Sequence, residues 1–324
     1  MNVDRIAGAF IGVILGDTLG MPVEKLSHEE IMKLNDGQGV IDFMPSRDDG
    51  FRAYAAGDTT DDWQLTRAVI RSLIRTKGVL DIEDCAREHV AEWVPDTTTW
   101  GNTTHKAIQD IKEGKRKATQ PVPRTTGKEG SGAGVVMKIA GLAAAAALRE
   151  THAEELDFDC ARLGALTHGN PVAWVTAYAV AEIIRGRLMG VPQGRDSTSD
   201  LAIWIRSFTD DERTPDEETF IDHLERLDEM SVEEVMALPF PKFSAIYCTL
   251  LSIKIARKHG DDFRAGVLEA VNAGGDTDTD ASIVGAIIGA GIGYNAVPDD
   301  WKNYRPEYAE AYTLAEELVD AIEE

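Results

Sequence analysis

Acidic residues gather in two short stretches of the chain, each of which leads directly into an apolar pattern with helical spacing. One stretch reads GDTTDDW at residues 57–63, and the other reads GGDTDTD at residues 274–280. Carboxylates packed this densely repel one another unless a cation compensates their charge. Aspartate and threonine oxygens without nearby cysteine or histidine suit Mg²⁺ or Mn²⁺ better than Zn²⁺. A site for hard divalent cations is therefore one interpretation of the two stretches, and helix capping is the other.

The second stretch is expected to present its acids together. Alternate residues of an extended loop point the same way, so Asp276, Asp278 and Asp280 could share one face, with Thr279 at the mouth of the next helix. A helix N-cap with acidic neighbours favoured by the helix dipole explains the same residues. A calcium EF-hand loop does not, because alanine and isoleucine occupy the positions of its required glycine and glutamate.

The first stretch has the same two interpretations. Successive residues at a helix start diverge by about 100°, so Asp61 and Asp62 could face two different ions, while Thr60 offers a hydroxyl between loop and helix. Simple capping of the helix is the competing explanation, and this stretch alone favours capping.

The elements that must position these stretches are helices. Apolar residues recur three or four positions apart, and no alternating run typical of a strand competes with them. The expected helices span residues 3–16, 64–78, 82–94, 103–113, 135–149, 171–187, 201–207, 217–227, 244–259, 281–294 and 306–322. A turn is expected at residues 16–24, and long loops at 115–134 and 188–200. We predict one all-α domain over residues 1–324.

Composition narrows the function class. The formal charge of −23, from 33 basic and 56 acidic residues, disfavours unaided binding to nucleic acid or to an anionic membrane. Cys85, Cys160 and Cys248 are odd in number and widely separated, so a disulfide framework is not expected, and a reducing, cytoplasmic location is favoured. Asp4 and Asp17 interrupt the apolar N-terminal run, which favours a buried first helix over a signal peptide or a membrane span.

Two weaker motifs could bind a substrate. The segment KEGSGAGVVMK at residues 128–138 is a glycine-rich loop that leads into a helix, where exposed amides can receive phosphate oxygens. A flexible connection is the more common meaning of such a loop. His168 stands at a helix end ahead of Pro171, where a lone histidine is more often a cap than a catalytic group.

Taken together, these segments resemble the ADP-ribosylglycohydrolase family, which includes dinitrogenase reductase-activating glycohydrolase. The resemblance rests on GDTLGMPVE at 16–24, GDTTDDWQLT at 57–66, GSGAGVVMKIAGL at 130–142, LTHGN at 166–170 and GGDTDTDASIVGAIIGA at 274–290. Their order and approximate separations match, and the likeness covers nearly the whole chain. It implies a compact all-α fold with a binuclear metal cleft between helices.

The resemblance also implies roles for individual residues. Two Mg²⁺ or Mn²⁺ ions would be held by Thr60, Asp61, Asp62, Asp276, Asp278 and Thr279. The substrate would be contacted by Trp100, Gly101, Lys128, Gly130, Ser131, Gly132, Ala133, Gly134 and His168, with the glycine-rich loop receiving the diphosphate of ADP-ribose. Glu24 is similar to the mobile acidic residue near the metals and is expected to handle a proton, and Asp61 is the second candidate catalytic residue.

The chain departs from the family pattern at three positions. Ala133 stands where asparagine or cysteine is common, and Lys138 replaces an arginine, so phosphate contacts would depend on the backbone rather than on bidentate side-chain geometry. Asp280 stands where a small or hydroxyl residue is common. We interpret Asp280 as a solvated residue at the helix start in preference to an acid that supports the metal ligands.

The function expected from this resemblance is divalent-metal-dependent hydrolysis of the N- or O-glycosidic bond between ADP-ribose and an acceptor, with ADP-ribosylarginine on a protein as the first choice. Two alternatives stay open: hydrolysis of a free ADP-ribose derivative, and a non-catalytic ADP-ribose-binding or structural role. All six ligand positions carry oxygen-bearing side chains, which favours a functional site. The expected partner is an ADP-ribosylated protein or a small-molecule ADP-ribose conjugate.

Overall fold

The computed structural model describes residues 3–46, 54–93, 99–192, 197–208 and 213–324. Its α-helices are α1 (Val3–Gly20), α2 (His28–Ile31), α3 (Asp61–Arg75), α4 (Ile82–Glu92), α5 (Asn102–Lys112), α6 (Ala140–Leu148), α7 (Ala153–Ala165), α8 (Val172–Leu188), α9 (Thr198–Phe208), α10 (Pro215–Arg226), α11 (Val232–Met236), α12 (Ala245–His259), α13 (Phe263–Ala273), α14 (Thr277–Ile292), α15 (Asp299–Lys302) and α16 (Glu310–Glu323). Short 3₁₀ helices are η1 (Met21–Val23), η2 (Asn35–Gly37), η3 (Val136–Lys138), η4 (Leu227–Glu229), η5 (Tyr294–Ala296) and η6 (Pro306–Ala309). Within the described ranges there is no β-strand, which confirms the predicted all-α fold.

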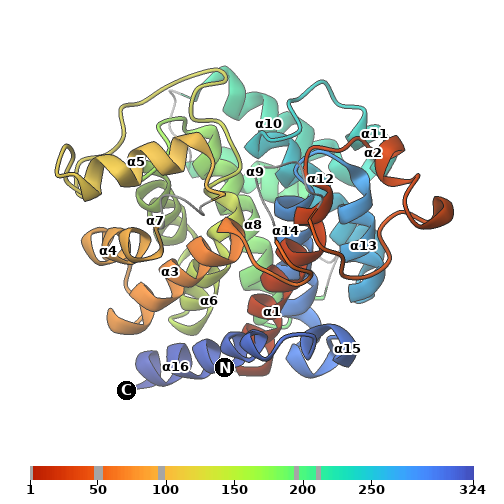
Figure 1. Cartoon of the computed structure of the whole chain (residues 1–324). Coiled ribbons are helices and arrows are strands. Elements are labelled where there is room, and N and C mark those ends of the chain that lie inside the picture. The colour runs from red at the N-terminus through yellow and green to blue at the C-terminus, as the bar shows by residue number, and fades with distance from the viewer. Residues whose placement is uncertain (1–2, 47–53, 94–98, 193–196, 209–212) are drawn as a thin grey trace.

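Helices α1 and α14 lie side by side in the middle of the molecule (Figure 1). Helices α3 to α7 lie on one side of this pair and α10 to α13 on the other, with α16 beneath them near both chain termini. The central pair is therefore the frame against which the other helices pack.

Glycine makes the contact between α1 and α14 possible. The face of α1 that meets α14 has glycine at positions 8, 12, 16 and 20. A Cβ atom added to Gly12 would lie 2.1 Å from the carbonyl oxygen of Gly285, and one added to Gly20 would lie 2.3 Å from that of Thr277. The helices run antiparallel in this contact, so the C-terminal end of α1 lies against the N-terminal end of α14. Two segments about 260 positions apart thereby meet.

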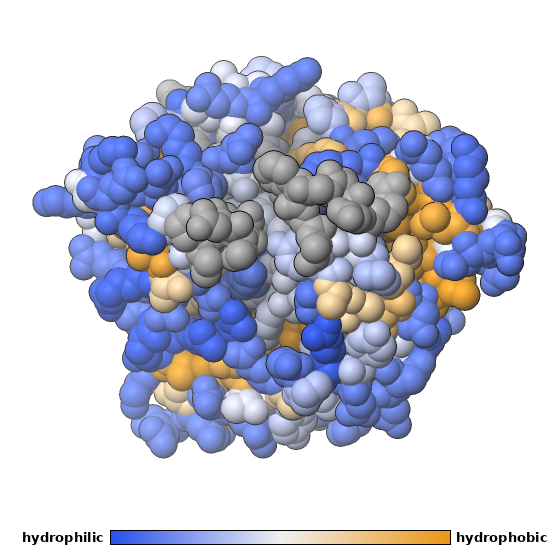
Figure 2. Space-filling model, in the orientation of Figure 1, coloured by the Kyte–Doolittle hydropathy of each residue, from blue (hydrophilic) through white to orange (hydrophobic). Residues whose placement is uncertain are grey.

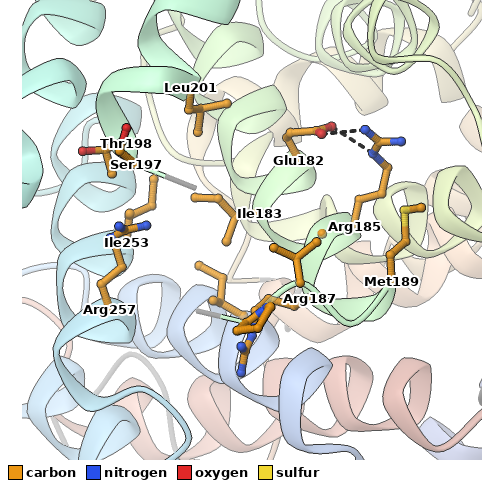
Figure 3. A pocket seen from close by; sticks show the side chains of 14 residues that line it. Glu182, Ile183, Arg185, Arg187, Met189, Ser197, Thr198, Leu201, Ile253 and Arg257 are labelled. Atoms are coloured by element: carbon orange, nitrogen blue, oxygen red, sulfur yellow. Dashed lines mark hydrogen bonds and ion pairs between the residues drawn. The ribbon is translucent and has the colours of Figure 1, made fainter. Parts of the chain in front are cut away.

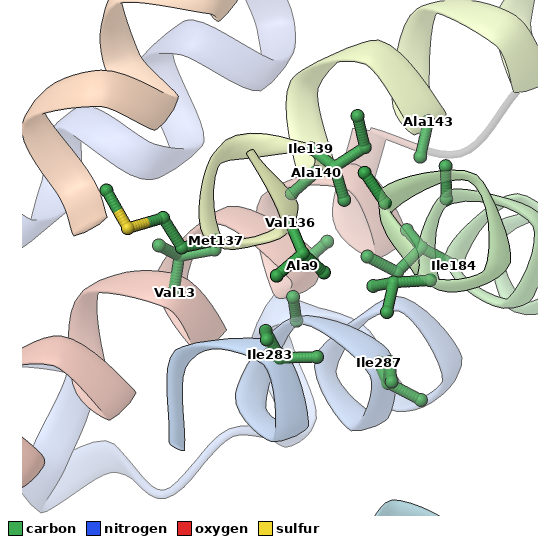
Figure 4. Packing of buried hydrophobic residues seen from close by; sticks show 14 of the residues in the cluster. Ala9, Val13, Val136, Met137, Ile139, Ala140, Ala143, Ile184, Ile283 and Ile287 are labelled. Atoms are coloured by element: carbon green, nitrogen blue, oxygen red, sulfur yellow. The ribbon is translucent and has the colours of Figure 1, made fainter. Parts of the chain in front are cut away.

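The first helix is buried, as the sequence predicts. By length and hydropathy α1 could cross a membrane, yet all of its apolar window lies inside the fold. Side chains from α1, η3, α8 and α14 converge on the core around it, as Figure 4 shows for Ala9, Val13, Val136, Ile184 and Ile283. The apolar N-terminal run is thus accounted for by core packing.

Several helix boundaries differ from the prediction. The turn expected at residues 16–24 starts later, because α1 continues through Gly20, and close packing on α14 outweighs the cost of about 1 kcal/mol for a glycine inside a helix. Helix α14 begins at Thr277 rather than at residue 281, and α6 begins at Ala140 after the 3₁₀ turn η3. Helices α7 and α13 were not predicted. Val94, the predicted end of the helix at 82–94, and part of the loop predicted at 188–200 lie outside the described residues.

Candidate active site

A cavity of about 220 Å³ opens where α3, α5 and α14 begin. Its described lining residues are Glu24, Asp61, Asp62, Thr99, Gly101, Asn102, Thr103, Thr104, Gly132, Ala133, Gly134, Met137, His168, Phe243, Asp276, Asp278 and Thr279. The cavity thus brings together the two acidic stretches, part of the glycine-rich loop and the histidine that the sequence analysis singles out.

Carboxylates from three segments meet at this cavity, and each of them except Asp17 is among its described lining residues. Oxygen atoms of Asp17, Asp62 and Asp278 lie within 4.8 Å of one another, and so do oxygen atoms of Glu24, Asp276 and Asp278. Asp278 belongs to both groups. The geometry therefore offers two neighbouring acidic sites that share one carboxylate.

Simple helix capping does not explain these residues. Thr60 is the N-cap residue of α3 and Asp276 is that of α14, but neither side chain makes a capping hydrogen bond. The positive ends of two helix dipoles point at the acidic cluster, which makes negative charge there less costly. The cap interpretation that the sequence leaves open is thus wrong for Thr60 and Asp276.

The electrostatics of the cluster show that it lacks positive charge. Burial, followed by the charge of Glu24, raises the pKa of Asp276 from 3.8 to about 7. Burial and neighbouring carboxylates also hold the pKa values of Asp62 and Asp278 well above their ordinary range. One buried oxygen of Asp62, Oδ1, has no hydrogen-bond partner. No lysine or arginine is among the described residues that line the cavity, so the site fits hard divalent cations.

Asp17 is a buried acid of this site that the sequence analysis does not single out. Its carboxylate accepts hydrogen bonds from the backbone N–H of Thr60 at 2.8 Å, from the hydroxyl of Thr60 at 2.5 Å and from the N–H of Trp63 at 3.2 Å. Both oxygens are engaged, so Asp17 is better suited to holding the start of α3 than to binding an ion. Thr60, a predicted ligand, is fully buried behind the cavity and does not line it. The sequence signal for Asp17 is its position inside an apolar, glycine-rich helix, because a buried acid there needs hydrogen-bond partners.

Asp61 is held by a residue that the sequence analysis also misses. The hydroxyl of Thr99 accepts the backbone N–H of Asp61 at 3.1 Å and donates to the carboxylate of the same residue. Phe243 also lines the cavity, and the fold brings it there from a distant part of the chain. Neither residue belongs to a motif in the sequence, so only the structure identifies them.

A hydrogen-bonded chain orients His168 toward the glycine-rich loop. The Lys138 ammonium donates to the hydroxyl oxygen of Thr167 at 3.4 Å, and that hydroxyl lies 2.9 Å from Nδ1 of His168. The Lys138 ammonium only donates, which favours donation of the Thr167 hydroxyl proton to Nδ1, and we infer that the neutral ring carries its own proton on Nε2. Burial, followed by the charge of Lys138, lowers the pKa of His168 to about 3, which keeps the ring neutral. A Cβ atom added to Gly134 would lie 3.2 Å from Nε2, so this N–H donor lies beside the loop.

Other predicted substrate residues lie outside the cavity lining. Lys128, Gly130 and Ser131 precede the part of the loop that reaches the cavity. Trp100 is buried and donates from its indole nitrogen to the side-chain oxygen of Gln64 at 3.0 Å. Their predicted contacts with substrate stay predictions.

The interpretation of Asp280 as a solvated residue is wrong. Asp280 is fully buried, near Cys248 and Lys242 and away from the cavity lining. Because α14 already begins at Thr277, residues two apart point to nearly opposite sides of the helix. Asp280 therefore does not share a face with Asp278, as an extended loop would have required.

Glu24 lies at the rim of the cavity, directly after η1. Its side chain is 17% exposed and pairs with Lys25 at 3.3 Å. The adjoining backbone is tied to the second acidic stretch, because the N–H of Lys25 donates to the carbonyl of Gly275 at 2.8 Å and the N–H of Gly275 donates to the carbonyl of Leu26 at 2.9 Å. If Glu24 is mobile, as predicted, its side chain must move while these two backbone hydrogen bonds remain in place.

A separate cavity of about 300 Å³ lies between α8, α9, α12 and α14 (Figure 3). Ile183 and Leu201 contribute to its apolar walls. The Arg185 guanidinium pairs with Glu182 at 2.5 Å, and that of Arg187 pairs with Asp261 at 2.5 Å. Among the described residues that line this cavity there is no cluster of carboxylates, so the acidic cavity is the candidate active site.

Comparison with known proteins agrees with this assignment. The sequence model of the ADP-ribosylglycohydrolase family matches residues 2–324. The chain is 26% identical over 304 residues to ADP-ribosyl-[dinitrogen reductase] glycohydrolase of Rhodospirillum rubrum, covering 92% of this chain and 89% of that protein. It is 25% identical over 360 residues to ADP-ribosylhydrolase ARH3 of Mus musculus, covering 100% of this chain and 93% of that protein.

A solved structure described as an ADP-ribosylglycohydrolase-related protein complex has a similar fold. It superposes with a TM-score of 0.73 at 25% identity, over 99% of this chain and 98% of that one. The family match, the relatives and the fold all extend over nearly the whole chain. The chain belongs to the ADP-ribosylglycohydrolase family.

Proposed function

We propose that this protein hydrolyses the glycosidic bond between ADP-ribose and an acceptor, using two Mg²⁺ or Mn²⁺ ions, and that ADP-ribosylarginine on a protein is its main substrate. The observation that carries the proposal is the convergence of two acidic groups on Asp278 within a cavity that also contains Gly132–Gly134 and His168. An acidic metal site and a phosphate-binding loop in one cavity suit a substrate that has both a ribose and a diphosphate.

The residues present fit two divalent ions. Asp61, Asp62, Asp276 and Asp278 supply carboxylate oxygens, Thr279 supplies a hydroxyl, and the unpartnered oxygen of Asp62 is one that a cation would satisfy. When bound, the ions would supply positive charge that holds the ribose hydroxyls and stabilises negative charge near the bond that breaks. Asp278, common to both acidic groups, is the residue proposed to contact both ions.

The protein's own groups would orient the rest of the substrate. Backbone amides of Gly132–Gly134 and the Nε2–H of His168 are proposed to receive diphosphate oxygens. Glu24, at the rim, is proposed to take a proton from the attacking water. The oxygen of that water then forms a bond to the anomeric carbon, the bond from this carbon to the acceptor breaks, and Glu24 returns the proton to the acceptor as it leaves.

Two observations support a protein, and in particular a basic one, as the acceptor. The printed name of the Rhodospirillum rubrum relative gives an ADP-ribosylated protein, dinitrogen reductase, as its substrate. The formal charge of −23 on this chain favours approach by basic partners.

A substrate panel tests the proposal. Arginine-linked, serine-linked and nucleotide-linked ADP-ribose would be incubated with the protein in Mg²⁺, in Mn²⁺ and in chelator, and released ADP-ribose measured. We expect release from the arginine-linked substrate with either metal and loss of release in chelator. Release from the serine-linked substrate alone would refute the arginine assignment, and no metal-dependent release from any substrate would refute the proposed activity.

A further inference from the structure

A cysteine thiol lies behind the acidic cavity, against one of the proposed metal ligands. Cys248, in the first turn of α12, is fully buried and is not among the described residues that line the cavity. Its thiol donates to Oδ2 of Asp276 at an Sγ–Oδ2 distance of 3.6 Å. The carboxylate of Asp276 belongs to the acidic group that it forms with Glu24 and Asp278. The thiol therefore contacts a carboxylate of the proposed cation site from outside the cavity lining.

The thiol proton can be accepted by the carbonyl oxygen of Lys242 or by the carboxylate of Asp276. Sγ lies 3.4 Å from the carbonyl oxygen and 3.6 Å from Oδ2 of Asp276. A hydrogen bond to an ionised acceptor is roughly twice as strong as one to a neutral acceptor, so the ionised carboxylate is the favoured partner. Asp280 also lies near Cys248, but it is not among the described residues that line the cavity. The thiol thus acts on the cavity through Asp276.

The first turn of α12 is fixed in place, so the thiol is a preset donor. The backbone N–H of Ala245 donates to the carbonyl of Ser131 at 2.8 Å, and the side chain of Ser244 caps the helix by accepting the N–H of Tyr247 at 3.2 Å. Asp276 differs, because it is the N-cap residue of α14 but its side chain makes no capping hydrogen bond. The thiol on α12 therefore restrains a carboxylate that its own helix does not cap.

The thiol is also protected from solvent. The face of the molecule in Figure 2 is largely hydrophilic, and Cys248, being fully buried, forms no part of this surface. A thiol buried in a fold holds its proton at neutral pH, and water does not compete with Asp276 for it.

We propose that Cys248 is a positioning residue of the cation site, whose thiol holds the carboxylate of Asp276 in the orientation that binds a divalent ion. Partners that hydrogen-bond to a metal ligand typically change metal affinity by about 10–100-fold. A thiol is a weak donor, so an effect at the lower end of this range is expected. The inference rests on the proposed function, because the orientation of Asp276 matters in this way only if the cavity binds divalent ions.

Binding of Mn²⁺ in the absence of substrate tests this inference. Cys248→Ala and Cys248→Val both remove the donor, the valine without leaving a hole, whereas Cys248→Ser keeps a donor at the same position. Cys160→Ala is the matched control, because Cys160 is also a fully buried thiol and lies on α7, outside the described cavity lining. The dissociation constant of Mn²⁺ is measured for each full-length protein by electron paramagnetic resonance of the unbound ion. Urea unfolding in chelator gives the stability of the same proteins.

We expect Cys248→Ala and Cys248→Val to bind Mn²⁺ about tenfold more weakly than the wild type, and Cys248→Ser and Cys160→Ala to bind it as the wild type does. Wild-type affinity in the alanine and valine variants, or an equal loss in Cys248→Ser, would overturn the role of the thiol and leave the proposed function standing. An equal loss in Cys160→Ala would do the same, because the cause would then be a general loosening of the core. A wild-type protein that binds no Mn²⁺ would overturn both this inference and the proposed two-ion site.

Discussion

Raising the pH should increase the stabilisation of this protein by divalent cations. In the folded protein burial raises the pKa values of Asp17 and Asp276 from 3.8 to about 7. An acid whose pKa is higher in the folded than in the unfolded state contributes stability at low pH, and this contribution is lost as the pH rises from its unfolded to its folded pKa. Without metal, the acidic cluster should therefore become more destabilising between about pH 4 and about pH 7.

The size of the effect follows from Asp276. A rise of its pKa from 3.8 to about 7 corresponds to about 4 kcal/mol between fully protonated and fully ionised forms. With an unfolding entropy of about 2 cal/mol/K per residue, this change shifts the melting temperature of a chain of this length by roughly 6 °C. Bound cations would offset the repulsion and favour the ionised carboxylates, so their effect should be largest where the cluster has lost its protons.

The assay is thermal unfolding at about pH 5 and about pH 8, each with saturating Mn²⁺ and with chelator. Burial lowers the pKa values of His89 and His168 to about 3. Their contribution to the stability of the folded protein therefore increases as the pH rises toward 6.5. Because it does so with and without metal, the difference between the two conditions isolates the acidic cluster. We expect this difference to be larger at the higher pH by roughly 6 °C. An equal or smaller difference at the higher pH would refute the assignment of these carboxylates as a cation site.

Three substitutions test other parts of the structure. Gly134→Ala places a Cβ atom 2.9 Å from neighbouring side chains and should weaken ADP-ribose binding, measured by calorimetry, about tenfold. Gly132→Ala, whose Cβ atom would have no contact closer than 3.8 Å, should bind ADP-ribose normally. Equal affinities of the two variants would contradict the close packing of the loop. Thr167→Val removes the hydroxyl that is inferred to fix the tautomer of His168, so ¹⁵N NMR of the imidazole should show a changed tautomer population. An unchanged population would rule out the hydrogen-bonded chain. Gly12→Ala brings a Cβ atom to 2.1 Å from the backbone of α14 and should lower the free energy of unfolding in urea by more than about 3 kcal/mol. Gly186→Ala, whose nearest contact would be at 3.8 Å, should leave this free energy unchanged. Similar stabilities of the two variants would contradict the packing of the central helices.

The fold class follows from local patterns, because apolar residues at helical spacing predict helices wherever the stripe is long. The meeting of the two acidic stretches is implied by the family resemblance, since each stretch by itself is also explained as a helix cap. The spacing of Phe263, Val267 and Ala270 in α13 is also helical, so this missed helix was within reach of the same reasoning.

The remaining features depend on contacts between distant segments. Gly20 stays helical because α14 lies against it, and a turn prediction based on glycine has no access to that contact. Thr99 and Phe243 reach the cavity from segments that carry no motif. Asp280 looked solvated because acids at helix starts usually are, yet α12 and α14 bury it. Tertiary packing decides each of these cases, and composition and periodicity do not report it.

The most direct measurement is an anomalous difference map from crystals of the protein grown with Mn²⁺ and ADP-ribose. We predict two manganese peaks in the acidic cavity, both in contact with the carboxylate of Asp278, and the distal ribose of the ligand beside them. The absence of manganese from this cavity, or a single peak that Asp278 does not contact, would contradict the proposal of a two-ion site.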